Sequence, residues 1–472
     1  MRAGRIMAAG AGAGAVGRLR DRLSGGAGRG AGLGARTARA GLWGMVELGG
    51  GNALRLLGNL AMTRLLAPEA FGLMAMVTVV HIALVLFTDL GINQSVVRSP
   101  RGDDPRFLRV AWAAQVLRSL GIAALVVAAA GALALLAPGI APADSVYADQ
   151  ALPALIAVSA LAIVLKGLES TNVWLADRRL QLGRIAFVNL SGQAAGLLAM
   201  LGLALVHPSV WSLLWGGLIG SAVATLLSHA AFAGPRMGLV WDREIAAELW
   251  RFGRNILLAS ALGFVANYAD RVYMGGLLDV AAFGFYVIAL TWATLFVTVV
   301  EKLASQVGLA TLSEVMRERP GEVAGLYRRF SRAIDGICVA AFLGCLLGGP
   351  LLIRLLYPAD YAVSADFIPF FAVAVLTRRF VPLVGLLMSR GDSGALLWST
   401  LIRAGAMALA LPLGNLAFGP AGAILASALT PLAAAPLLIW RSRDILGPAA
   451  RREAAWIGAI LAVAPVMLWI HG

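Results

Sequence analysis

A short stretch of the chain occurs twice, as LLAPEAFG at residues 65–72 and as LLDVAAFG at residues 277–284. Five of the eight positions are identical, so we expect the same local structure at both places. Each copy lies between two apolar runs of about 20 residues, the length that crosses hydrocarbon as an α-helix. The 472 residues are 60% hydrophobic and 14% charged, with a mean hydropathy of +0.81, which excludes a soluble globular protein. The sequence therefore predicts an all-α integral membrane protein.

Outward from the two copies, about 13 apolar spans follow one another along the chain. They cover residues 41–63, 71–90, 110–137, 151–173, 185–206, 209–233, 252–274, 281–300, 334–357, 364–388, 394–414, 418–440 and 453–471. The copies lie after the first and the seventh span, and the even number of spans between them gives both halves the same orientation. We therefore expect two six-helix bundles related by a parallel repeat, plus one extra C-terminal transmembrane helix.

This pattern predicts four parts of the chain. They are a disordered basic cytoplasmic tail (1–40), an N-terminal six-helix bundle (41–235), a C-terminal six-helix bundle (236–442) and an accessory transmembrane helix (443–472). The tail consists mostly of Gly, Ala and Arg, so it has too few large apolar side chains to form a core. One amphipathic interfacial helix is expected from Ser313 to Arg332.

Basic residues are distributed unevenly between the two predicted sides. Thirty of the 39 Lys and Arg residues fall in the tail or in connections on its side, against Arg64 and Arg354 on the other side. Because Lys and Arg concentrate in cytoplasmic loops, the N-terminus is predicted to be cytoplasmic. Orientation thus accounts for the net charge of +14, and no nucleic-acid partner is expected.

Seven basic residues remain inside the apolar spans: Arg55, Arg118, Lys166, Arg271, Arg378, Arg379 and Arg403. A charge that faces lipid near the bilayer centre costs at least about 2.5–3.5 kcal/mol, so such a side chain normally faces a partner or a wet cavity. For Arg118, Arg378 and Arg379, near span ends, we favour snorkelling to the headgroups. Arg403 lies in the middle of a span, and both interpretations stay open.

The first helix of each half carries a polar stripe. Asn52, Arg55 and Asn59 share one helix face in the first half, and Asn267, Asp270 and Arg271 form a similar patch in the second. We expect these six residues to line a substrate cavity. The alternative is polar contacts that only hold the helices together.

Other charged residues are candidates for ion coupling. Lys166 and Glu169 are three residues apart on one helix, so they can form either a structural ion pair or a coupling site in the cavity, and Asp89 is a further intramembrane carboxylate. The chain has no P-loop, HExxH or CxxC motif, and Cys338 and Cys345 lie on one helix face. We therefore expect no cofactor, no metal site and no enzymatic activity.

Residues 64–72, followed by FTDLG at 87–91, resemble the polysaccharide transporter or lipopolysaccharide flippase family of the multidrug/oligosaccharidyl-lipid/polysaccharide (MOP) exporter superfamily. ADRV at residues 269–272 is similar to the seventh-helix signature of that family, and the resemblance extends from about residue 40 to residue 440. It implies a V-shaped pair of bundles that flips an undecaprenyl-diphosphate-linked oligosaccharide across the bacterial inner membrane by alternating access. Arg55 and Arg271 match its cationic cavity, where guanidinium groups would hold the diphosphate. Family members usually have 12 or 14 spans rather than 13.

The resemblance also implies partners. These are the lipid-linked oligosaccharide, membrane lipids and the polymerase or export machinery for exopolysaccharide, capsule or O-antigen. Two alternatives remain: a cation-coupled drug or solute exporter of the same superfamily, and a membrane glycosyltransferase or polymerase. An arginine-rich cavity disfavours a cationic drug because like charges repel. The longest predicted outside loop, residues 138–150, has no histidine for transferase chemistry.

Overall fold

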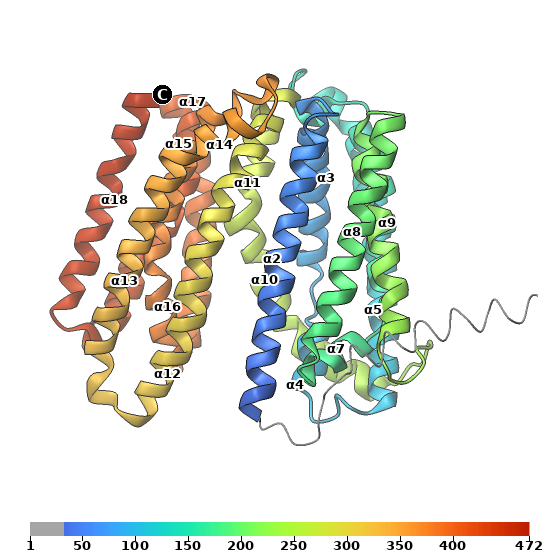
Figure 1. Cartoon of the computed structure of the whole chain (residues 1–472), viewed down its shortest axis with the longest axis horizontal. Helices are drawn as coiled ribbons and strands as arrows, with labels where there is room; N and C mark the ends of the chain where they lie inside the picture. The colour runs from blue at the N-terminus through green and yellow to red at the C-terminus, as the bar shows by residue number, and fades with distance from the viewer. Residues whose placement is uncertain (1–32, 472) are drawn as a thin grey trace, which may run out of the picture. The chain divides into compact units, whose positions relative to one another are not determined.

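The computed structural model describes residues 33–471, and helices account for most of this range (Figure 1). Within it, the only β-type pairing is an isolated bridge between Ser145 and Asp279. The predicted all-α fold class is therefore confirmed. Most of the predicted N-terminal tail lies outside the described range, and α2 already begins at Leu33.

The helices follow the predicted spans closely. Up to residue 277 they are α2 (Leu33–Met62), α3 (Pro68–Phe87), α4 (Ile92–Arg98), α5 (Pro105–Ile140), η1 (Val146–Ala148), α6 (Leu152–Gly167), α7 (Asn172–Arg178), α8 (Leu182–Val206), α9 (Val210–Ala231) and α10 (Arg243–Leu277). Beyond it they are α11 (Val280–Lys302), η2 (Leu303–Val307), α12 (Gly308–Glu318), η3 (Pro320–Glu322), α13 (Val323–Leu343), η4 (Gly344–Gly348), α14 (Gly349–Leu356), η5 (Ala359–Tyr361), α15 (Ser364–Thr377), η6 (Arg378–Phe380), α16 (Val381–Ser389), α17 (Ser393–Leu446) and α18 (Ala449–His471).

Within residues 33–471, nine helices are long and apolar enough to cross a membrane, and the bent pair α6 and α7 would be a tenth candidate. This makes the protein a multi-pass membrane protein. α17 counts once, although it contains two predicted spans and its backbone leaves helical geometry at Phe418 and Gly419, where the second of them begins. Each of the predicted spans is largely helical in the structure. The number of helices that cross the membrane stays a prediction.

Local sequence explains several helix ends. Pro68 stands in the first turn of α3, where its missing N–H costs nothing. The Asp279 carboxylate caps α11 by accepting a hydrogen bond from the Ala282 N–H at 2.7 Å. The amphipathic helix expected from Ser313 to Arg332 is wrong: α12 ends at Glu318 and α13 begins at Val323. Pro320 and Gly321, both poor helix formers, lie in the turn between them.

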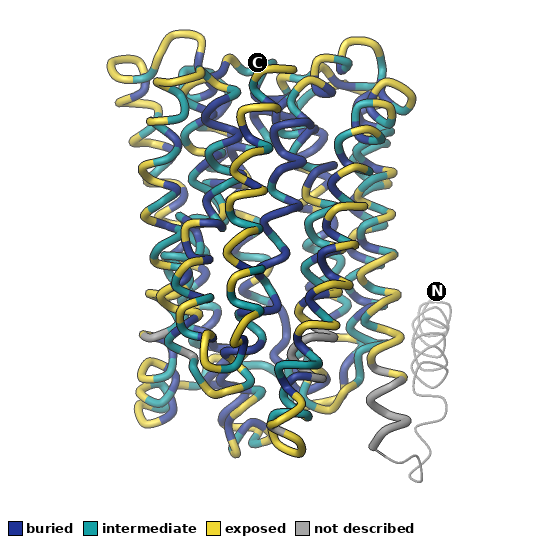
Figure 2. The backbone as a smooth tube through the Cα atoms, turned by 90° about the vertical axis from the view of Figure 1, so that its left-hand side faces the viewer, coloured by how far each residue is buried: buried dark blue, intermediate teal, exposed yellow. Residues whose placement is uncertain are grey.

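The chain packs as two compact units. Among the described residues, unit 1 contains those up to Met62, Asp89–Leu125 and Ser159–Asn255, and unit 2 contains Thr63–Thr88, Val126–Val158 and those from Ile256 on. Buried and exposed positions alternate turn by turn along the helices of both units, as expected where one helix face packs and the other meets lipid (Figure 2). The predicted boundaries of the two six-helix bundles stay a prediction.

Candidate functional site

A cavity of about 350 Å³ lies within unit 2. Its walls come from α10, α11, the α15–η6 segment and both halves of α17. Apolar side chains such as Leu290, Phe371 and Met407 form part of the lining. Five charged residues also line it: Asp270, Arg271, Glu301, Arg378 and Arg403. The cavity therefore combines apolar walls with a net positive charge, which suits a ligand that carries an anionic group.

Arg271 is neutralised by its neighbour in sequence. Its Nη1 atom donates to Oδ1 of Asp270 at 3.0 Å and to the carbonyl oxygen of Asn267 at 2.6 Å. The guanidinium also lies over the Tyr268 ring, 4.9 Å from its centroid. The other carboxylate oxygen of Asp270 accepts a 2.7 Å hydrogen bond from the hydroxyl of the buried Tyr286 on α11. The structure thus brings the predicted residues Asn267, Asp270 and Arg271 together at the cavity.

Arg378 also has an acidic partner. Its Nη1 atom donates to Oε1 of Glu301 at 2.8 Å, from η6 to α11. Its Nε atom is buried and makes no hydrogen bond with the described part of the chain. The interpretation of Arg378 as a snorkelling residue is therefore wrong, because a carboxylate from another helix holds the side chain at the cavity wall.

Arg403 is the least compensated cation of the cavity. Its Nη2 atom donates to Oδ1 of Asn267 at 2.9 Å, and Asn267 is in turn held by donating from Nδ2 to the Gly263 carbonyl at 2.7 Å. No carboxylate of residues 33–471 forms an ion pair with Arg403, and its Nε atom is buried without a partner there. A guanidinium with a free N–H in an apolar wall favours an anionic ligand, because a buried charge without a partner is costly.

The stripe on α2 is placed elsewhere. Asn52, Arg55 and Asn59 belong to unit 1, and the cavity of unit 2 does not include them. Arg55 is exposed, and it has no polar partner within the described range, whereas Asn52 and Asn59 are half-buried. Substrate binding by the α2 stripe therefore stays a prediction.

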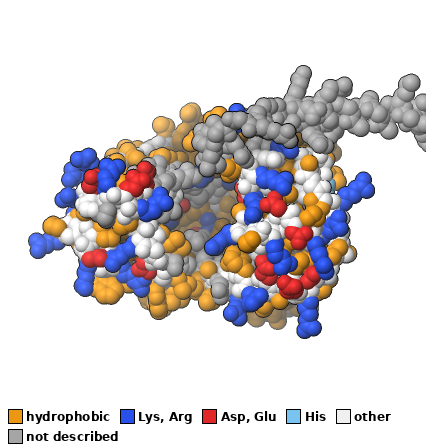
Figure 3. Space-filling view, turned by 90° about the horizontal axis from the view of Figure 1, so that it is seen from below, with side chains coloured by type: hydrophobic (Ala, Val, Ile, Leu, Met, Phe, Trp, Pro, Cys, Tyr) orange, Lys and Arg blue, Asp and Glu red, His pale blue; other side chains and the backbone are white. Residues whose placement is uncertain are grey.

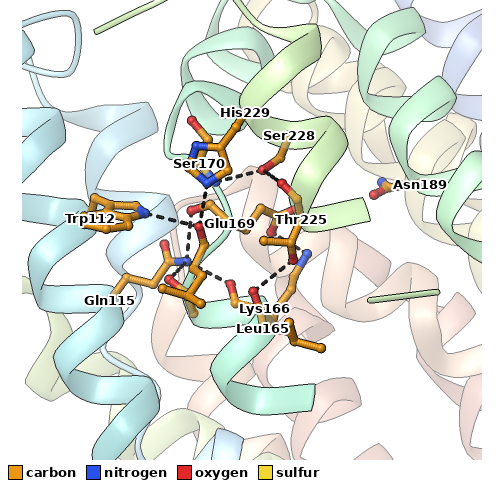
Figure 4. A network of polar contacts seen from close by, with 12 residues as sticks. Trp112, Gln115, Leu165, Lys166, Glu169, Ser170, Asn189, Thr225, Ser228 and His229 are labelled. Atoms are coloured by element: carbon orange, nitrogen blue, oxygen red, sulfur yellow. Dashed lines mark hydrogen bonds and ion pairs between the residues drawn. The ribbon is translucent and has the colours of Figure 1, made fainter. Parts of the chain in front are cut away.

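Lys166 and Glu169 do form the predicted ion pair, at 2.5 Å, where α6 breaks before α7 (Figure 4). The Lys166 side chain is 69% exposed and that of Glu169 only 8%. Side chains from other helices satisfy the carbonyls freed by the break: Nε2 of Gln115 donates to the Gly167 carbonyl at 2.9 Å, and Nε2 of His229 lies 2.8 Å from that of Leu168. The network thus holds Glu169 at a fixed helix break.

Asp89 has a local contact with the backbone. One of its carboxylate oxygens accepts a 2.9 Å hydrogen bond from the N–H of Gly91, in the turn between α3 and α4. Gly91 has a φ of +54°, which few residues other than glycine adopt. Asp89 therefore stabilises a turn whose backbone depends on Gly91.

Arg379 lies in a buried ionic network away from the cavity lining. Its Nε atom donates to Asp335 on α13 at 2.8 Å, and its Nη1 atom donates to Glu453 on α18 at 2.7 Å. Arg452, next to Glu453, pairs with the other oxygen of Asp335. Because the Arg379 side chain is only 1% exposed, the snorkelling interpretation is wrong for this residue.

From the sequence alone, the role of Arg403 stays open, and neither Glu301 nor Tyr286 stands out as a candidate. The only signal for Arg403 was its depth in a span, since Asn267, its partner, is 136 positions away. Glu301 directly follows the apolar span 281–300, so the sequence predicts that it lies in a connection. Its pairing with Arg378, 77 positions away, has no local sequence signature.

Comparison with known proteins identifies a matching family model and solved structures with a similar fold. A family model described as polysaccharide biosynthesis protein matches residues 61–366. A structure of the lipid II flippase MurJ, in an inward closed conformation, is 10% identical with a TM-score of 0.65 and covers 91% of this chain and 97% of its own. An inward-facing multidrug resistance transporter of the MATE family and MOP superfamily is 15% identical with a TM-score of 0.64, covering 86% and 99%.

A third structure, a MOP superfamily transporter from Pyrococcus furiosus, is 16% identical with a TM-score of 0.58 and covers 87% of this chain and 96% of its own. At these identities the three structures show the fold alone. No curated protein matches the chain. The family model spans well over half of the sequence, so this chain, with the fold of the MOP transporters, belongs to the polysaccharide biosynthesis protein family.

Proposed function

We propose that this protein is a flippase that moves an undecaprenyl-diphosphate-linked oligosaccharide across the bacterial inner membrane for surface polysaccharide synthesis. The observation that carries the proposal is Arg403, an uncompensated guanidinium in a cavity inside the apolar helices of unit 2. A diphosphate offers the paired oxygen acceptors that a guanidinium fork binds best. Family membership and the fold shared with MurJ, described as a lipid II flippase, support the same substrate class.

Charge placement supports the proposed orientation. Figure 3, seen from below, shows many Lys and Arg side chains. In unit 1, Arg101 follows α4, Arg106 lies in the first turn of α5 and Arg179 follows α7, and each pairs with an acidic residue of the same unit. The positive-inside rule supports a cytoplasmic location for these basic segments, and we propose that the N-terminus lies on the same side. The flippase would pass its substrate from this side to a polymerase or export system on the other.

The proposal predicts a defined lesion in a strain that lacks the protein. Polyprenyl-diphosphate carrier that bears complete repeat units should accumulate, and surface polysaccharide should be lost, because assembly continues while translocation stops. Extraction of the lipid-linked units and their mass analysis measure this directly. A normal carrier pool would instead favour the drug exporter, and incomplete units would favour a glycosyltransferase.

For ion coupling we propose Glu169, in preference to Asp89. A nearly buried carboxylate beside an exposed lysine can exchange that partner for a proton or a cation while the helix break itself stays in place. Glu169→Gln keeps the size and hydrogen bonding of the side chain but removes its charge. We expect export in cells to fall at least about tenfold, because every transport cycle would lack the group that couples it to the ion or proton.

Asp89→Asn is the matched control, because asparagine can still accept the hydrogen bond from Gly91. Export by this variant should stay near the wild-type level. If instead Glu169→Gln exports normally, Glu169 serves only to hold the helix break. If Asp89→Asn alone is defective, the coupling assignment belongs to Asp89.

A further inference from the structure

The first third of α10, residues 243–254, belongs to unit 1 and lies outside the cavity lining. The helix has 35 residues, so it is about 52 Å long, whereas the hydrocarbon of a bilayer is only about 30 Å thick. The predicted span begins at residue 252, near the end of this segment. The first third of α10 is therefore expected at the level of the lipid headgroups.

One face of this segment packs into unit 1. Ile245 and Leu249 are 1% and 4% exposed, and they belong to a hydrophobic cluster with residues of α4, α5 and α7. The acidic side chains of the segment are paired with the same unit. Glu244 and Glu248 form ion pairs with Arg101, at 3.2 and 3.7 Å. Both carboxylates are thus used within unit 1.

The opposite face of the segment combines arginine with tryptophan. Arg243, Trp250 and Arg254 lie at i, i+7 and i+11, so they share one face of the helix, and Arg251 borders this face. Trp250 is 58% exposed. The three arginines are exposed and make no hydrogen bond or ion pair with the described part of the chain. We call these four residues the α10 arc.

The positive-inside rule accounts for the side of the membrane on which these arginines lie, but not for their sorting around the helix. Within the same twelve residues, both glutamates meet Arg101, whereas the three arginines are exposed without a partner in the described chain. Three positive charges therefore remain at headgroup level beside an exposed indole. Tryptophan is itself favoured at that level, because its ring is amphipathic.

From this arrangement we propose that the α10 arc is a binding site for an anionic phospholipid. Guanidinium groups bind phosphate oxygens through paired, charge-assisted hydrogen bonds. A zwitterionic lipid carries a cation beyond its phosphate, which the arc repels, so the site selects phosphatidylglycerol over phosphatidylcholine. The inference goes beyond the proposed function, because it holds for any substrate of the cavity. Only the leaflet, the cytoplasmic one, follows from the proposed orientation.

Lipid binding by the purified full-length protein tests the site. The protein in detergent is titrated with dioleoyl phosphatidylglycerol, and native mass spectrometry measures the apparent dissociation constant of the first bound lipid. The double variant Arg251→Gln, Arg254→Gln should bind this lipid at least about tenfold more weakly, since each juxtamembrane arginine adds to the attraction. Dioleoyl phosphatidylcholine should bind the variant and the wild type equally weakly.

A charge-matched control separates the arc from net charge. Arg328→Gln, Arg329→Gln removes two exposed arginines of α13 that also have no partner in the described chain, and it should bind phosphatidylglycerol like the wild type. Trp250→Leu keeps every charge and should weaken binding about threefold through loss of the indole. An equal loss in both double variants, or no loss in Arg251→Gln, Arg254→Gln, would overturn the site.

Geranyl diphosphate distinguishes a lipid headgroup from the diphosphate of the proposed carrier. Arg251→Gln, Arg254→Gln should bind this soluble analogue with wild-type affinity in titration calorimetry, because the cavity of unit 2 is intact. If the variant lost affinity for geranyl diphosphate as well as for phosphatidylglycerol, the arc would belong to the substrate path and the phospholipid site would be refuted. A failure of the proposed substrate in the carrier-pool assay leaves the phospholipid site standing.

Discussion

Replacing Arg403 by alanine is expected to stop export of the lipid-linked oligosaccharide while the protein still folds. Among the described residues, Arg403 donates a side-chain hydrogen bond to Asn267 and forms an ion pair with no carboxylate, so its loss leaves no buried charge behind. A charge-assisted contact to a diphosphate contributes about 1.5–3 kcal/mol, which corresponds to roughly a 10- to 150-fold weaker complex. Cells with this variant should accumulate carrier that bears complete repeat units.

Binding by the purified protein tests the same point directly. Geranyl diphosphate, a short water-soluble analogue of the carrier, serves as the probe, and its dissociation constant is measured by titration calorimetry. Arg354→Ala is the matched control, because Arg354 is an exposed arginine on α14 of the same unit and lies outside the cavity lining. Arg403→Lys should recover only part of the affinity, since an ammonium lacks the planar fork. Equal affinity in all four proteins would refute the assignment.

Arg271 behaves differently from Arg403 in this scheme. Its removal leaves Asp270 buried without its cation, although Tyr286 still donates to the carboxylate. We therefore expect Arg271→Ala to lower the melting temperature as well as export, so a loss of export in this variant does not identify a ligand contact. The double variant Asp270→Asn, Arg271→Gln removes both charges together and should melt closer to the wild-type temperature. Thermal unfolding in detergent distinguishes the two variants.

The membrane class and the positions of the helices could be predicted from the sequence because both depend on local hydropathy. The polar patch on α10 was predicted for the same reason, since Asn267, Asp270 and Arg271 are neighbours on one helix. Their partners were not predictable. Arg403 and Tyr286 come from other helices, and the choice between snorkelling and pairing depends on which residue lies opposite.

Arg379 shows this limit most clearly. In sequence it is a basic residue inside the apolar span 364–388, beside Arg378 and two or three helical turns from the span boundary, and both fit the pattern of snorkelling residues. In the structure their side chains point in different directions. Arg378 forms an ion pair with Glu301 at the cavity, whereas Arg379 forms ion pairs with Asp335 and Glu453. Two adjacent arginines thus have different roles, because the turn η6 directs them toward different helices.

The Arg379 network also makes a strong prediction for α18, the helix beyond the sequence repeat. Glu453 is fully buried, and its two oxygens accept hydrogen bonds from Arg379 at 2.7 Å and from Ser331 at 3.2 Å. Glu453→Ala would leave two arginines, Arg379 and Arg452, sharing the single carboxylate of Asp335, and it would open a small cavity beside the buried Arg379 guanidinium. Removing one partner of a buried ion pair typically costs about 3–5 kcal/mol. We expect this variant to melt at a much lower temperature and to expose α18 to proteolysis.

Glu314→Ala, which removes an exposed glutamate on α12, is the matched control and should melt like the wild type. In the double variant Arg379→Met, Glu453→Leu, both charges of the central pair disappear, while Asp335 keeps Arg452 as its partner. Its melting temperature should return most of the way to that of the wild type, because apolar side chains of similar volume can replace a buried ion pair without loss. If the double variant were instead as unstable as Glu453→Ala, hydrogen bonds to Ser331 and stacking on Trp456, rather than charge balance, would hold α18 in place.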